Sequence, residues 1–263
     1  MSILNVGGTE AWMANTIQIG GQKTLDQLIK SLFADGTQGI YLNAQDAVSV
    51  SDLSSIKDLS GRNNHATQVN ATSRASLITD PSGYKSLKFD GIDDGYVTPS
   101  INFSNTDKVT VIAAVRKLSD ATQGLVTELS TNIYTYNGTF NMLAPAGTDT
   151  ANRYRFAVKG TLLTTKYTST TSEVGDTAVM RGVADVSNGK AGFYLNGIMQ
   201  GSNDSNLGTG NYGNYPLYIG RKGGTSLPFN GQIYALLVIG KLLDDATTQR
   251  IEKEFAKYIG VTL

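Results

Sequence analysis

A chain of 263 residues is long enough for one large β domain or for two small domains, so length alone does not choose between them. Its 22 basic and 22 acidic side chains give a formal net charge of zero, which argues against a nucleic-acid-binding surface. The chain has no cysteine and one histidine, which excludes disulfides, thiolate chemistry and clusters of histidine ligands.

The distribution of apolar residues does not favour a membrane anchor. No segment approaches the ~18 consecutive apolar residues of a membrane span, and the N-terminal MSILNVGGTEAW lacks the basic and apolar runs of a signal peptide. No membrane partner is therefore expected. The 29 glycines, 13 tyrosines and 17% charged residues are typical of an all-β protein with many turns.

Residues 1–39 differ from the rest of the chain and are predicted to form an N-terminal attachment segment. Within it, TLDQLIKSLF has apolar side chains at helical spacing, and Thr24 can cap the helix. These side chains are Leu25, Leu28, Ile29 and Leu32. A helix this short needs a surface to dock on, which is either the body of the protein or a neighbouring subunit.

From Ile40 onward, short segments of alternating polarity recur about every ten residues and are separated by Gly, Asn, Asp and Ser, as in a β-sandwich or barrel. Asn188-Gly189 and Asn196-Gly197 predict tight turns that make residues 178–200 a three-stranded meander. GQIYALLVIGK is apolar on both faces, which predicts a central strand. Other predicted strands are KVTVIAAVRK from Lys108, GLVTELS from Gly124, RYRFAVKG from Arg153 and PLYIGRK from Pro216.

The chain closes with a second predicted helix in DDATTQRIEKEFAKYIG. Asp244 or Asp245 can cap it, and Gly260 is placed to end it. Its apolar stripe is expected to cover the outer face of the GQIYALLVIG strand. The stripe consists of Ile251, Phe255, Tyr258 and Ile259.

Five motifs in order carry a family resemblance: KDLSGRNNHATQ, SLKFDGIDDGYV, FYLNGIMQG, LYIGRKGG and FNGQIYALLVIGKLLDDATTQRIEKEFAKYIG. This order resembles the laminin-G-like, concanavalin A-like jelly-roll family from about Ile40 to Gly260. The resemblance implies an all-β jelly-roll sandwich over residues 40–263, with a short N-terminal helical segment and a C-terminal helix. One jelly roll serves lectins, adhesins, hydrolase domains and structural parts, so it implies less about function.

A narrower resemblance concerns function. NFSNTDKVTVIAAVRKLSDATQG and GTGNYGNYPLYIGRKGGTSLPFNG are similar to the version of this domain in tailed-bacteriophage virion proteins. It implies a non-catalytic structural and adhesive protein located in the virion, on the tail or as a capsid decoration, with homotrimers as the expected assembly. The N-terminal segment would contact other virion proteins through Trp12, Leu25, Leu28 and Leu32.

Three aspartates in LKFDGIDDGYV allow a metal site or a turn. Asp90, Asp93 and Asp94 are favoured as turn residues at the end of a strand. In this interpretation Leu87, Phe89 and Ile92 point inward. Calcium needs about six to eight oxygen ligands, of which three neighbouring carboxylates supply only a part. Calcium at these residues is the one cofactor left open.

Catalysis is not expected. Glycoside hydrolysis needs two carboxylates flanking the bond. Laminarinase-like members of the fold carry E-x-D-x-x-E on one strand, and that pattern is absent here. His65 lies in a structural motif of the family and is expected to be hydrogen-bonded rather than a catalytic base. The glutamates are Glu10, Glu128, Glu173, Glu252 and Glu254.

The alternative function is a lectin that recognises a host surface polysaccharide, with a glycan-cleaving enzyme as a weaker third hypothesis. In GTGNYGNYPLY, amides and aromatic rings occur together, as sugar recognition requires, although a protein interface has the same chemistry. The candidate carbohydrate- or partner-binding residues are Asn211, Tyr212, Asn214 and Tyr215.

Overall fold

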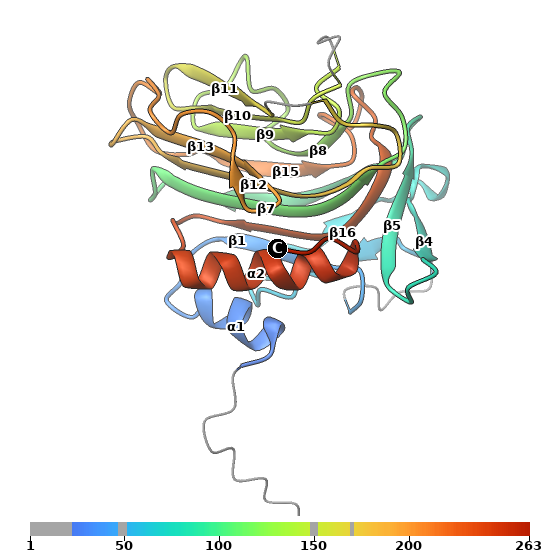
Figure 1. The fold of residues 1–263 in the computed structure, drawn as a ribbon. Coiled ribbons are helices and arrows are strands. Elements are labelled where there is room, and N and C mark those ends of the chain that lie inside the picture. The colour runs from blue at the N-terminus through green and yellow to red at the C-terminus, as the bar shows by residue number, and fades with distance from the viewer. Residues whose placement is uncertain (1–22, 47–51, 148–151, 169–170) are drawn as a thin grey trace, which may run out of the picture.

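The computed structural model describes residues 23–46, 52–147, 152–168 and 171–263, which fold as a sandwich of two antiparallel sheets (Figure 1). This confirms the predicted all-β jelly roll. No helix in these ranges is long and apolar enough to cross a membrane.

Sheet A has the strand order β14-β13-β12-β7-β16-β5-β4, and β1 pairs with the half of β16 that β5 leaves free. The strand predicted to be central is β16, which is buried along nearly its whole length. The strands of this sheet are β1 (Gly39–Asn43), β4 (Ser76–Thr79), β5 (Lys85–Asp90), β7 (Lys108–Lys117), β12 (Thr177–Asp185), β13 (Lys190–Leu195), β14 (Ile198–Met199) and β16 (Asn230–Ile239).

Sheet B has the order β11-β10-β9-β8-β15-β6-β3-β2 and forms the other layer of the sandwich. A short 3-10 helix, Ala71–Ser73, follows β3. The strands of this sheet are β2 (Ser55–Ile56), β3 (Ala66–Thr67), β6 (Tyr96–Asn102), β8 (Leu125–Leu129), β9 (Thr139–Leu143), β10 (Arg155–Lys159), β11 (Leu163–Tyr167) and β15 (Asn214–Ile219).

An apolar cluster lies on the outer face of sheet A, beneath helix α2 (Asp245–Tyr258). Asp244 caps this helix by accepting a hydrogen bond from the Thr247 amide. As predicted, α2 covers β16: Leu237 belongs to the same cluster as Ile251 and Phe255. The neighbouring strand β7 also buries both of its faces, which the sequence pattern did not indicate.

The N-terminal helix α1 (Leu25–Leu32) docks on the body of its own chain. Thr24 and Gln27 form a reciprocal capping box, as the sequence allowed. Ile29 and Phe33 are fully buried in the cluster beneath α2. The three leucines proposed for particle attachment are half-buried against the same cluster. They are Leu25, Leu28 and Leu32.

The KDLSGRNNHATQ motif forms a hydrogen-bond network that fixes β1. The buried carboxylate of Asp58 accepts from the amides of Tyr41, Ser60 and Asn64 and from the Ser60 hydroxyl. The Asp58 amide donates to Nδ1 of His65 at 3.0 Å. The predicted structural role of His65 is therefore confirmed.

The two Asn-Gly pairs form different turns. Asn196 and Gly197 have φ of 50° and 77° and connect the paired residues Leu195 and Ile198, which is the predicted two-residue hairpin. At 188–189 only Gly189 has positive φ, and four residues separate Asp185 from its partner Lys190. The connection there is longer than predicted, but the three-stranded meander is present.

Candidate functional site

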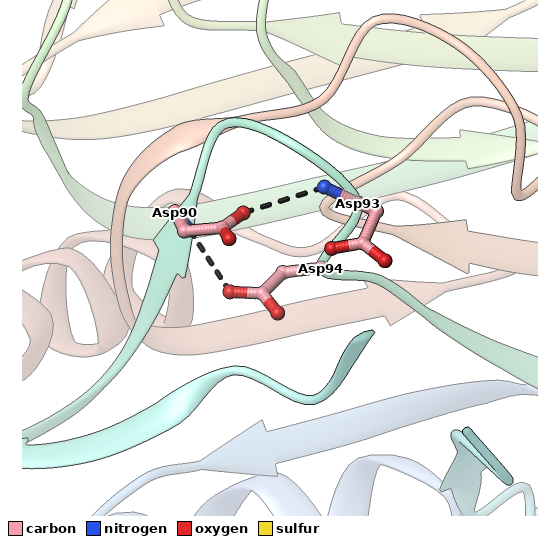
Figure 2. Close-up of side chains that lie close together, drawn as sticks. All are labelled: Asp90, Asp93 and Asp94. Atoms are coloured by element: carbon pink, nitrogen blue, oxygen red, sulfur yellow. Dashed lines mark hydrogen bonds between the residues drawn. The ribbon is translucent and has the colours of Figure 1, made fainter. Parts of the chain in front are cut away.

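Asp90, Asp93 and Asp94 shape the bend between β5 and β6 (Figure 2). Asp90 accepts hydrogen bonds from the amides of Ile92 and Asp93, and Asp94 accepts from the Asp90 amide at 2.9 Å. The Asp93 carboxylate accepts from the Ser73 hydroxyl at 2.6 Å. The predicted turn role is confirmed, but Ile92 does not point inward: it is 71% exposed at the tip of the bend.

The three carboxylates also converge, since one oxygen from each lies within 4.8 Å of the others. Burial raises the pKa of Asp94, and the charges of Asp90 and Asp93 raise it further, against the lowering effect of the Asp90 amide. A cation here would find three acidic ligands, of which each already accepts a hydrogen bond from the protein. Calcium binding stays a prediction.

The predicted sugar-binding loop, residues 211–215, is only partly available to a ligand. Tyr212 is 2% exposed, and its ring lies 6.0 Å from that of Phe140 inside the sandwich. The prediction that Tyr212 forms a binding platform was therefore wrong. Asn211 and Asn214 are exposed, although the Asn211 amide already donates to the Ser104 carbonyl at 2.7 Å.

Tyr215 lies near two tyrosines that were not among the predicted binding residues. Its ring centroid lies 5.4 Å from that of Tyr136, which is 41% exposed, and Tyr134 in the same loop is 60% exposed. The Lys222 ammonium lies 5.1 Å from the centre of the Tyr134 ring. We call Tyr134, Tyr136 and Tyr215 the tyrosine patch. The sequence signal for it was STNIYTYNG, in which two tyrosines alternate with small polar residues between predicted strands.

A buried glutamate holds the loop that carries the patch. Glu128 on β8 is fully buried, and its Oε1 accepts from the Ile133 amide at 2.6 Å. Burial raises the pKa of Glu128 to about 7, against the lowering effects of Lys222, the Ile133 amide and Arg155. The Lys159 ammonium donates to the Tyr134 carbonyl at 3.0 Å and fixes the loop from a second side.

One predicted site residue, Trp12, lies outside the described residues. The described attachment candidates on α1 lie apart from the tyrosine patch. Helix α1 packs on the outer face of sheet A, whereas the patch belongs to sheet B, through strand β15 and the loop between β8 and β9. Of the predicted binding residues, Tyr215 therefore packs on an exposed ring of the patch, and Asn214 is exposed beside Tyr215.

Solved structures with similar folds include a domain in complex with a trisaccharide and two toxin domains described as binding domains. Domain 4 of the arabinanase AbnA from Geobacillus stearothermophilus, in complex with arabinotriose, has a TM-score of 0.59 at 17% identity and covers 82% of this chain and 98% of its own. The binding domain of Paraclostridial Mosquitocidal Protein 1 has a TM-score of 0.60 at 16% identity over 88% of this chain. The receptor-binding domain of botulinum neurotoxin D has a TM-score of 0.60 at 10% identity over 86% of this chain.

This chain spans 53% of each of the two toxin chains. At these identities the likeness concerns the fold. No curated protein matches the sequence. Residues 90–247, more than half of the chain, match the Laminin_G_3 profile of the concanavalin A-like lectin/glucanases superfamily. The chain therefore belongs to the concanavalin A-like lectin/glucanases superfamily, through its Laminin_G_3 family.

Proposed function

We propose that this protein is a non-catalytic adhesion module on the surface of a bacteriophage virion, and that it binds host surface glycan through the tyrosine patch. The observation that carries the binding part is the tyrosine patch, in which Tyr134 and Tyr136 are exposed in one loop and the ring of Tyr136 lies 5.4 Å from that of the half-buried Tyr215. The virion part is supported by the sequence resemblance described above.

The patch has the chemistry that a pyranose requires. Its aromatic faces can pack against the apolar C–H face of a sugar, and nearby polar groups can bond the hydroxyls. Lys222, beside Tyr134, supplies donors, and the exposed amide of Asn214 adjoins Tyr215. The fold agrees with such a role, because one similar domain is described in complex with arabinotriose.

A catalytic role has less support. A retaining glycosidase places its two carboxyl groups ~5 Å apart, and an inverting one separates them somewhat more. The charged groups that act on Glu128 are the cations Lys222 and Arg155. Its Oε1 is also engaged by the Ile133 amide. The surroundings of Glu128 therefore suit a loop anchor better than a catalytic acid.

The packing of α1 favours the residues that precede this helix as the part that attaches the protein to the particle. Ile29 and Phe33 are buried in the protein's own core, so α1 has little apolar surface left for a partner. We therefore assign contact with other virion proteins to residues 1–22, which include Trp12. A homotrimer is the proposed assembly, and native mass spectrometry would measure it.

The binding proposal is tested on a glycan array with the full chain and two variants. Tyr136→Ala removes an exposed ring and is expected to abolish the signal, while the melting temperature stays unchanged. Tyr167→Ala is the matched control, because Tyr167 is 38% exposed on β11, outside the patch. An array without any signal for the unmodified protein would overturn the glycan proposal.

The virion proposal is tested by immunogold electron microscopy of purified particles, with antibody raised against the protein. Label on the head would identify a capsid decoration, and label on the tail would favour receptor recognition. Intact particles without label would overturn the virion proposal and leave a free lectin as the function to pursue.

A further inference from the structure

A cavity of about 450 Å³ opens on the outer face of sheet A, between α2 and the β13–β14 hairpin. It is separate from the tyrosine patch, which belongs to strand β15 of sheet B and to the loop between β8 and β9. The lining residues that matter for recognition are Arg181, Tyr194, Asn196, Ile198, Gln249 and Glu252.

Arg181 is held in place from two sides. Its Nε donates to Glu252 at 2.9 Å, and the centre of its guanidinium lies 3.5 Å from the centre of the Tyr194 ring, directly across the strand pair β12–β13. The Arg181 side chain is 13% exposed and that of Glu252 is 3% exposed. Among the described residues, the structure gives no hydrogen-bond partner to the two terminal amino groups of Arg181. These donors are preorganised for a ligand.

The rest of the lining combines amides with an apolar surface. The Oδ1 atom of Asn196 accepts from the Val179 amide at 2.8 Å, which orients its Nδ2 donor. Gln249 is exposed on α2 and can both donate and accept. Ile198 is 68% exposed at the rim of the cavity and offers an aliphatic surface.

The charges that line the cavity balance. Arg181 and Lys253 carry positive charge, and Asp245 and Glu252 carry negative charge. An anionic ligand would therefore meet no net attraction, and it would approach the Glu252 carboxylate that already pairs with Arg181. A neutral ligand with many hydroxyl groups makes use of both the donors and the acceptors.

We propose that this cavity is a saccharide site for a neutral sugar, distinct from the tyrosine patch. Two adjacent hydroxyls accept from the terminal amino groups of Arg181, a third is bonded by the amide of Asn196 or Gln249, and a C–H face of the ring packs on Ile198. This site does not depend on the patch. A protein that binds glycan on two faces can bind two neighbouring polysaccharide chains at once, which raises its overall affinity for a polysaccharide surface.

The test is an NMR titration of the full chain with labelled backbone and side-chain amides. The probes are arabinotriose and maltotriose as neutral trisaccharides, with glucuronate as an anionic comparison. Saturable shifts are expected at Asn196, Gln249 and the Arg181 Nε–H with a neutral probe. Arg181→Lys keeps the charge beside Glu252 but loses the forked donors, and is expected to weaken this binding about tenfold.

Two further variants make the titration decisive. Arg250→Lys is the matched control, because Arg250 lies on α2 but does not line the cavity. Gln249→Ala changes an exposed side chain and is expected to cost about threefold in affinity, which tests the site even if Arg181→Lys unfolds the protein.

The possible outcomes separate this site from the proposed function. Shifts confined to the tyrosine patch would overturn the second site and leave the first. Shifts confined to the surroundings of Arg181 would support the second site and count against the patch. Binding of glucuronate without either neutral trisaccharide would overturn the assignment to a neutral sugar, and so would the absence of any shift near Arg181 at high millimolar concentrations of all probes.

Discussion

The loop that carries Tyr134 and Tyr136 is fixed by a single buried side chain, that of Glu128. Its carboxyl group is fully buried, and its Oε1 accepts from the amide of Ile133 in the loop that carries two tyrosines of the patch. Burial raises its pKa from 4.5 to about 7, so the folded protein holds a proton that the unfolded chain releases at lower pH. The stabilising contribution of this protonated carboxyl is complete below pH 4.5 and is lost as the pH rises through about 7.

We therefore predict that Glu128→Gln raises the free energy of unfolding above neutral pH. The amide keeps an oxygen to accept from Ile133 but carries no charge, so the variant gains up to ~3 kcal/mol over the unmodified protein at a pH well above 7. The two proteins should be nearly equally stable below pH 4.5. Urea unfolding across this range measures the difference, and parallel stability profiles would contradict the role assigned to Glu128.

Replacement of Tyr212 by alanine is predicted to destabilise the protein far more than replacement of Tyr136. Tyr212→Ala empties a buried site beside Phe140 and should lower the free energy of unfolding by ~3–5 kcal/mol. Tyr136→Ala removes a ring that is 41% exposed and should change it by less than ~1 kcal/mol. Thermal unfolding of both variants measures this, and equal losses would show that the two rings are equally buried.

This contrast shows where sequence reasoning about the site fails. Tyr212 and Tyr215 stand three residues apart in a loop rich in Asn and Gly, and nothing in the local pattern says which ring turns inward. The backbone decides it: the amide of Tyr212 donates to the Thr106 carbonyl, and the next amide, of Gly213, donates to the Gly138 carbonyl. These partners are distant in sequence, so the exposure of each ring depends on tertiary contacts.

At the scale of secondary-structure elements, apolar periodicity predicted the strands whose buried faces are lined by apolar side chains. It identified β7, β8, β10, β12, β13, β14, β15 and β16 and both helices. It missed β9, because Thr139 and Asn141 on the outer face of this strand are fully buried polar residues. It also missed β11, a polar strand at the edge of sheet B. Both strands depend on neighbours that a local pattern does not reveal.

The hydrogen-bond network around Asp58 is predicted to stabilise the position of β1. Both carboxylate oxygens accept hydrogen bonds: Oδ1 from the amides of Tyr41 and Ser60, and Oδ2 from the Ser60 hydroxyl and the Asn64 amide. Asp58→Asn replaces one acceptor by a donor that faces other donors. We expect a loss of ~2–3 kcal/mol in the free energy of unfolding. Hydrogen exchange should show the loss first in β1, and unchanged protection of the Tyr41 amide would contradict this account.

At the scale of the whole molecule, the boundary between attachment segment and sandwich is set by packing as well as by sequence. The sequence pattern places this boundary at residue 39. Ile29 and Phe33 are fully buried, and Gly39 pairs with Ile239 as the first residue of β1. Removal of this stretch would expose the cluster that α2 shares with β16.

We therefore predict different results for two truncations. Deletion of residues 1–22 retains α1 with its buried side chains Ile29 and Phe33, so the shortened protein should keep the packing of α1 on the sandwich and remain folded. Deletion of residues 1–39 should lower the free energy of unfolding by ~3–6 kcal/mol, the value of about two large apolar side chains returned to water. If residues 1–22 attach the protein to the particle, the shorter deletion should also abolish incorporation into virions while glycan binding persists. Normal incorporation of that folded protein would show that attachment resides in the sandwich, and equal stability of the two truncations would show that α1 contributes nothing to the core.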